Sequence, residues 1–165
     1  MSCGIRAATA ADAETLLSLI EALADYEHLP RPDAEARRRF AEHGFGEQPL
    51  FHALLAEAGG RAIGYAIYFF TYSTFLARPT LYLEDIFVLP EERQHGAGTE
   101  LMRHLARVAL DKGCGRFEWQ VLEWNQLARG FYEKLGATHL SEWLPYRLTR
   151  AEIEALAQEE GERRA

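Results

Sequence analysis

Cysteine is scarce in this sequence. Its 165 residues include two cysteines, Cys3 near the start and Cys114 after a predicted helix, and their spacing is not that of a metal-binding pair. A structural disulfide is therefore not expected. The six histidines show no H-x-x-E-H or H-E-x-x-H spacing, so the sequence supports no metal site.

Long hydrophobic runs are also missing. No apolar stretch approaches the roughly 18 residues of a membrane-spanning helix. The N-terminal segment MSCGIRAATAADAE becomes polar within a few residues, which is not typical of a signal peptide. The sequence thus predicts a cytoplasmic protein with no membrane partner.

Basic residues are outnumbered, because 18 Lys and Arg face 25 Asp and Glu for a formal net charge of −7. This balance argues against nucleic acid as a partner and favours a small cation. Solubility alone is an alternative reason for the acidity. A hydrophobic content of 48% and the chain length predict a single globular domain over residues 1–165.

Hydrophobic periodicity predicts an α/β fold. Helices are expected over residues 9–27, 33–44, 98–112, 125–135 and about 149–160, followed by a frayed tail. Thr9 with Asp12 resembles a capping pair, and Asp33 and Asn125 are expected to be the N-caps of the second and fourth helices. Strands are expected in GIRAA, LFHALLAEA, RAIGYAIYFFTYS, TLYLEDIFVL and RFEWQVL, with one or two more in THLSEWLPYRL. The predicted order is βααβββαβαβ(β)α around a mostly antiparallel central sheet of six to seven strands, flanked by helices.

The segment PEERQHGAGTELM, residues 90–102, opens a helix with a glycine-rich turn. Such a helix start presents unpaired N–H groups and a positive dipole end to an anion. Gly96 and Gly98 carry no side chains that would hold phosphates away, and Arg93 can pair with phosphate oxygens. No Gly-Lys-Ser/Thr follows, and Met102 replaces the third glycine of a dinucleotide fingerprint. Glycines that open the helix only for packing are the alternative.

The segment from Arg93 to Gly98 fits the pattern R/Q-x-x-G-x-G/A, and the sequence resembles the GCN5-related N-acetyltransferases. The segments EHGFGEQPLFHALLAE, YLEDIFVLPEER, VLEWN and FYEKLGA are similar to the diamine acetyltransferase branch, which includes spermidine/spermine and thialysine acetyltransferases. The resemblance implies acetyl-CoA as the acyl donor and a homodimer. It also implies a set of residues that contact the donor, namely Phe87, Val88, Arg93, Gln94, His95, Gly96, Ala97, Gly98, Thr99, Asn125 and Tyr132.

Acetyl transfer to an amine needs a base for the ammonium proton and an acid for the thiolate. The resemblance gives these roles to Glu84, acting through a water, and to Tyr132. Asp85 becomes an acceptor-site carboxylate. Neighbours on a regular strand point to opposite faces, so both acids reach one site only if a bulge re-aims them. Two solvent-facing acids and a packing role for Tyr132 are the alternatives.

The expected acceptor site comprises Glu27, Ser73, Phe75, Glu84 and Asp85. Where polyamine-acetylating members carry an Asp and a Trp, this chain reads YSTF, so one counter-charge is missing. This difference favours a small-molecule amine such as thialysine, a lysine-like compound or a short diamine. A variable surface loop, a polyamine acceptor, a protein amino group and a non-catalytic acyl-CoA-binding module are the alternatives.

Overall fold

The structure is a computed structural model that describes residues 3–158. The chain divides into two compact units, Met1–Gln120 and Val121–Ala165. The first unit contains five strands, which are β1 (Gly4–Ala7), β2 (His52–Ala58), β3 (Arg61–Ser73), β4 (Arg78–Val88) and β5 (Arg116–Trp119). Its helices are α1 (Ala13–Glu27), α2 (Ala34–Phe45) and α3 (Ala97–Asp111), with short 3-10 turns at Ala10–Asp12 and Pro90–Glu92.

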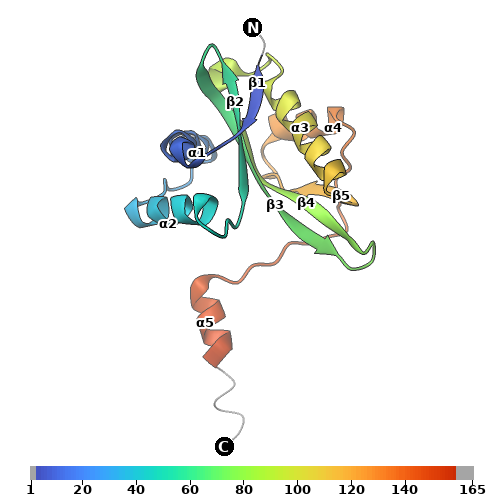
Figure 1. Ribbon diagram of the computed structural model, residues 1–165. Coiled ribbons are helices and arrows are strands. Elements are labelled where there is room, and N and C mark those ends of the chain that lie inside the picture. The colour runs from blue at the N-terminus through green and yellow to red at the C-terminus, as the bar shows by residue number, and fades with distance from the viewer. Residues whose placement is uncertain (1–2, 159–165) are drawn as a thin grey trace, which may run out of the picture. The chain divides into compact units, whose positions relative to one another are not determined.

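The five strands form one sheet in the order β1-β2-β3-β4-β5. All neighbours are antiparallel except β4 and β5, which run parallel. Helices α1 and α2 lie on one face of the sheet and α3 on the other (Figure 1). The predicted α/β class and the predicted order from the first strand to the fifth are confirmed.

The core on the α1 side is built from alternate residues of the central strands. Leu16 and Leu19 of α1 pack with Tyr65, Ile67 and Phe87, which all project from the same sheet face. On the α3 side the fully buried residues include Leu101 and Leu105. Each such leucine contributes roughly 1.5–3 kcal/mol through burial. The face shared by α1, β3 and β4 is also the face that carries the candidate site.

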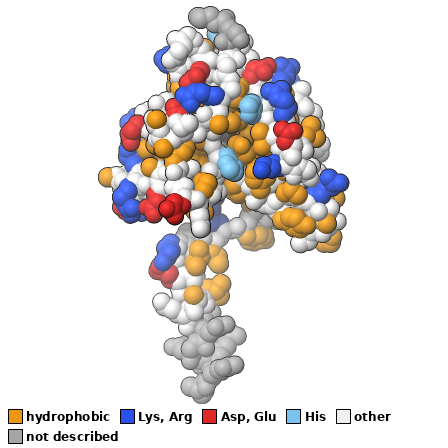
Figure 2. All heavy atoms as spheres, viewed as in Figure 1, with side chains coloured by type: hydrophobic (Ala, Val, Ile, Leu, Met, Phe, Trp, Pro, Cys, Tyr) orange, Lys and Arg blue, Asp and Glu red, His pale blue; other side chains and the backbone are white. Residues whose placement is uncertain are grey.

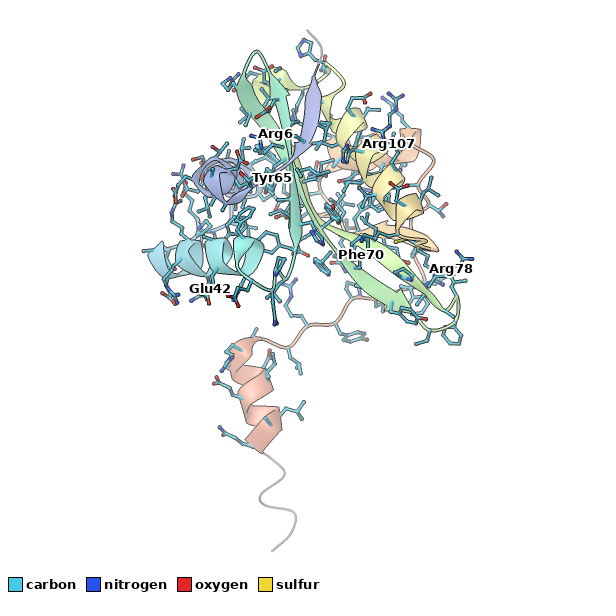
Figure 3. The ribbon with its side chains drawn as sticks, viewed as in Figure 1. Arg6, Glu42, Tyr65, Phe70, Arg78 and Arg107 are labelled. Atoms are coloured by element: carbon cyan, nitrogen blue, oxygen red, sulfur yellow. The ribbon has the colours of Figure 1, made fainter. Side chains whose placement is uncertain are left out.

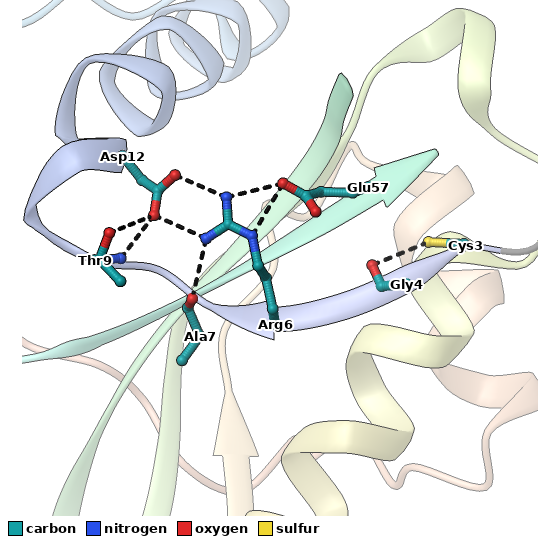
Figure 4. A network of polar contacts seen from close by, with 7 residues as sticks. All are labelled: Cys3, Gly4, Arg6, Ala7, Thr9, Asp12 and Glu57. Carbon is teal, nitrogen blue, oxygen red and sulfur yellow. Dashed lines mark hydrogen bonds and ion pairs between the residues drawn. The ribbon is translucent and has the colours of Figure 1, made fainter. Parts of the chain in front are cut away.

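The chain enters α1 through a polar network (Figure 4). The Arg6 guanidinium pairs with Asp12 and Glu57 at 2.8 Å each, so it links β1, the turn before α1, and β2. The backbone N–H of Thr9 donates to the Asp12 carboxylate at 2.7 Å, which confirms the predicted capping pair. The predicted N-cap at Asp33 is confirmed as well, because its side chain accepts from the Ala36 N–H at 2.8 Å.

The second unit contains α4 (Gln126–Lys134) and α5 (Arg150–Gln158). The prediction of one or two strands in residues 138–148 is wrong, since the described part of this unit forms no strand. Alternating apolar residues can give a strand two faces, but a strand forms only when its backbone pairs with a neighbour. The described sheet therefore has five strands rather than six or seven. The end of the predicted last helix, residues 159–160, and the predicted frayed tail lie outside the described residues.

Acidic and basic side chains alternate over the surface around α2 (Figure 2). On this helix Arg38 pairs with Glu35 and Glu42, and Arg39 also pairs with Glu35. Such exposed pairs contribute little stability, about 0.3–0.5 kcal/mol each. They show that α2 turns its charged face to solvent and leaves the apolar face for the sheet.

Candidate active site

A β-bulge interrupts β4 at Glu84. In the register with β3, Leu83 lies opposite Tyr68 and Asp85 opposite Ile67, so Glu84 is the extra residue. In a regular strand, residues 83 and 85 would share a face. The bulge instead places Leu83 on the Tyr68 face and Asp85 on the Ile67 face, beside α1. Glu84 and Asp85 could serve one site only if a bulge re-aimed them, and β4 contains such a bulge.

The pairing of β4 with β5 stops where the bulge begins. The two strands pair from Thr80 to Leu83, and no described strand continues this edge beyond Leu83. Phe87 and Val88, which the resemblance places against the pantetheine arm, lie on this open part of β4. An extended ligand can pair with such an edge as an added strand would.

The glycine-rich loop ends in a helix start without a side-chain cap. Gly96 is the N-cap of α3 in the left-handed region, with φ 88°, and no side chain of the described residues caps it. The first bond within the helix runs from the Glu100 N–H to the Gly96 carbonyl at 2.9 Å. The amides of residues 97–99 precede this bond and lack partners within the helix. Gln94 and His95, the residues before these amides, are exposed. An anion can therefore approach the helix start from solvent.

Arg93 turns toward the protein. Its guanidinium lies over the rings of Tyr26, 4.7 Å from the centroid, and Phe87, 5.5 Å from the centroid. Its Nε donates to the Val88 carbonyl at 2.9 Å. These contacts join the loop to the end of α1 and to β4, a structural role that sequence reasoning missed because the three segments meet only in the fold.

Three carboxylates gather near the bulge. Burial raises the pKa of Asp85 to about 6, and the charges of Glu84 and Glu27 add to this rise, while the nearby Tyr65 hydroxyl lowers it. Burial also raises the pKa of Glu27, at the end of α1. Glu84 itself is exposed. Like charges this close are unfavourable, so the arrangement fits a site that receives a cation.

Ser73 and Phe75 lie away from these carboxylates, at the far end of the β3–β4 hairpin. Ser73 pairs in register with Arg78, six residues before Glu84, which corresponds to about 20 Å along a strand. Arg78 and Tyr65 are correspondingly far apart in Figure 3. The Ser73 hydroxyl is buried and accepts from the Leu76 N–H at 3.3 Å, whereas Phe75 is 96% exposed. Their predicted contact with the acceptor stays a prediction.

The second unit carries Asn125 and Tyr132. Asn125 caps α4 as predicted, because its side-chain oxygen accepts from the Ala128 N–H at 3.1 Å. The Tyr132 ring lies against Phe131, with centroids 5.4 Å apart. The predicted roles of Asn125 at the pantetheine and of Tyr132 as the acid stay predictions.

Residues 3–158 lack both a metal-binding cluster and a membrane-spanning helix. No cluster of three or more His, Cys, Asp or Glu in this range could hold a metal ion. No helix in the same range is long and apolar enough to cross a membrane.

The five-stranded mixed sheet, with a bulge in β4 and an uncapped start of α3, matches solved structures of N-acetyltransferases. Residues 16–137 match the acetyltransferase (GNAT) family, and the chain belongs to this family. It is therefore an acetyl-CoA-dependent N-acetyltransferase that acts on an amine.

Curated relatives agree with this family. The chain is 40% identical to the thialysine N-epsilon-acetyltransferase of Sus scrofa over 162 residues, which cover 93% of this chain and 95% of the relative. It is 38% identical to that of Mus musculus over 167 residues, or 94% and 98% of the two chains. Among solved structures, an aminoglycoside N-acetyltransferase in complex with CoA matches with a TM-score of 0.74 and 25% identity, covering 89% of this chain and 95% of that one.

Proposed function

We propose that the enzyme acetylates the terminal amine of a small cationic acceptor, such as thialysine, a lysine-like amino acid or a short diamine. The observation that carries this proposal is the group of carboxylates, Glu27, Glu84 and Asp85, at the bulge where β4 and β5 part. The curated relatives named for thialysine support the same class of acceptor.

The donor site is proposed around the start of α3. The backbone amides of the loop, with the Gly96 N-cap in the left-handed region, hold the pyrophosphate of acetyl-CoA. The backbone of Phe87 and Val88 binds the pantetheine arm along the open edge of β4. Asn125 contacts the same arm with the amide group that its capping bond does not use. The remaining contacts come from residues of the loop and of the first turn of α3, which are Arg93, Gln94, His95, Ala97, Gly98 and Thr99.

The chemistry is proposed to be a direct attack within a ternary complex. Glu84 accepts a proton from the acceptor ammonium through a water, and its exposure at the bulge supports access for that water. The amine nitrogen then forms the bond to the acetyl carbon while the bond from this carbon to sulfur breaks. Tyr132 donates a proton to the leaving sulfur, so CoA departs as a thiol.

The acceptor is proposed to bind through its positive charges. Glu27 and Asp85 pair with ammonium groups, while Ser73 and Phe75 stay proposed acceptor contacts. Few carboxylates gather at the bulge, which supports a short acceptor over a long polyamine with several charges. Polyamine and protein amino-group acetylation are the competing activities.

We also propose a homodimer in the cytoplasm, built from a single domain per chain. Large apolar side chains of the second unit are exposed, among them Trp143, which is 76% exposed, and Leu144, which is 73% exposed. Exposed apolar groups of this size support burial against a partner. The family match spans residues of both units, which supports one domain.

A panel of amines tests the substrate proposal, with CoA release as the readout. Thialysine, lysine, short diamines, spermidine and a peptide with a free amino terminus are compared at one acetyl-CoA concentration. We expect the highest kcat/KM for thialysine or a short diamine and a lower value for spermidine. If a peptide amino terminus reacts while thialysine and the diamines are inert, the acceptor proposal is wrong and the fold is unaffected.

A further inference from the structure

Tyr65 carries an unsatisfied polar atom in the core. Its side chain is 0% exposed, and no described residue makes a hydrogen bond of full geometry with its hydroxyl, although Asp85 lies close enough to interact with it. A buried hydroxyl that lacks a full hydrogen bond destabilises the folded protein. Such a group calls for an explanation, because phenylalanine would fill the same space without this cost.

The surroundings of the hydroxyl point to the acceptor site. Tyr65 lies opposite Phe87 on the sheet face that the bulge gives to Asp85. Burial, and then the charges of Asp85 and Glu27, raise the pKa of Tyr65 well above its usual value. The phenol therefore keeps its proton at neutral pH and can serve as a hydrogen-bond donor behind Asp85.

The other charged groups around Asp85 come from the elements that meet at this face. Glu27 approaches from α1 and Glu84 from the bulge on the same strand, and both disfavour a charged Asp85. Arg93 approaches from the loop, but its guanidinium lies over Tyr26 and Phe87. Of the groups that act on Asp85, the Tyr65 hydroxyl is the one that favours its carboxylate form.

We propose that Tyr65 is a positioning residue for the acceptor amine and acts through Asp85. This inference rests on the proposed acceptor site. When an ammonium group binds, Asp85 is held as a carboxylate, and the Tyr65 hydroxyl donates a full hydrogen bond to it. Where Asp85 is protonated before binding, its proton leaves to solvent as the ammonium arrives. The hydroxyl thus interacts with Asp85 in the unliganded enzyme and reaches full hydrogen-bond geometry in the acceptor complex.

The substitution Tyr65→Phe tests this role because it removes the hydroxyl and keeps the ring. We expect the KM for the preferred amine of the panel to rise ~3- to 10-fold, the effect of losing one hydrogen bond, with the KM for acetyl-CoA unchanged. The acid limb of the acceptor kcat/KM profile is expected to move to higher pH, because Asp85 loses the group that favours its charged form. The melting temperature of the unliganded variant at pH 5 should equal or exceed that of the wild type.

Tyr68→Phe is the matched control. Tyr68 lies on the same strand, is 8% exposed and faces the opposite side of the sheet, beside His52 and Phe70. Loss of the Tyr68 hydroxyl should change neither the KM for the acceptor nor the acid limb of the acceptor kcat/KM profile. An unmoved acceptor KM and acid limb in Tyr65→Phe would overturn the proposal, as would equal effects in both variants.

A readout that needs no acceptor separates this proposal from the proposed function. The pH dependence of melting in the unliganded protein reports the ionisation of Asp85. Tyr65→Phe should shift this dependence to higher pH. If the wild type acetylates no amine of the panel, the proposed function fails, and an unshifted melting profile would then reject the role of Tyr65 as well.

Discussion

Glu84 and Asp85 are adjacent in sequence, yet they occupy different environments. Glu84 is the exposed extra residue of the bulge, whereas Asp85 is largely desolvated and its pKa is raised to about 6. An exposed carboxylate that reaches water suits proton transfer through a water, and a desolvated one suits pairing with a cation. The proposed division of roles between the two acids therefore follows from where the bulge lies.

Tyr132→Phe tests the proposed acid. The substitution keeps the ring on α4 and removes the proton donor, so kcat should fall at least ~10-fold while acetyl-CoA still binds. The measurement is steady-state CoA release together with a binding titration of acetyl-CoA. Tyr146→Phe is the control, because Tyr146 belongs to the same unit and is 93% exposed. Unchanged turnover in the Tyr132 variant would remove this residue from the mechanism.

At the scale of elements, the start of α3 combines an unusual backbone with the proposed donor site. Gly96 has φ 88°, and an added Cβ would meet nothing within 4 Å, so the cost of a side chain there is conformational. Gly59, in the turn between β2 and β3, has φ 57° and equally open surroundings. The two glycines therefore make a matched pair.

Gly96→Ala and Gly59→Ala should both destabilise the protein by about 1–2 kcal/mol, the cost of a left-handed residue with a side chain. Gly96→Ala alone should also raise the KM for acetyl-CoA, by roughly 10-fold if helix-start amides worth about 1.4 kcal/mol lose their alignment. Thermal melting and acetyl-CoA titration measure the two effects. An equal loss of affinity in both variants would show that the loop does not hold the donor.

The features that sequence predicted are local. The capping pair of Thr9 and Asp12 and the N-caps at Asp33 and Asn125 depend on residues three positions apart, and all are present. The strand expected in residues 138–148 depends on a distant backbone and is absent from the described fold. The stacking of Arg93 on Tyr26 and the placement of Tyr65 on the same sheet face as Asp85 are likewise non-local. Sequence patterns therefore located the candidate loop and acids but not the contacts that join them.

At the scale of the whole molecule, stability responds to pH through carboxylates whose pKa values are shifted in opposite directions by folding. Arg6 and the capping bonds lower the pKa of Asp12, so its contribution is present above its unfolded pKa and is lost as the pH falls toward the folded value. Asp85 has a raised pKa, so its contribution is present at low pH and is lost as the pH rises through about 6. Part of the stability at neutral pH is thus given up to keep a charged Asp85 in the site.

Asp85→Asn should therefore make the unliganded protein more stable at high pH while it weakens acceptor binding. A rise from 3.8 to about 6 corresponds to about 3 kcal/mol at pH 8, and the gain should shrink to less than ~1 kcal/mol at pH 4. Melting curves of both proteins at pH 8 and pH 4 measure this difference. Asp12→Asn is the control with the opposite expected sign, since it should destabilise the protein at neutral pH. A gain of the same size at both pH values would mean that Asp85 is not held in an unfavourable charged state, and the case for a cation-binding site at the bulge would lose its electrostatic basis.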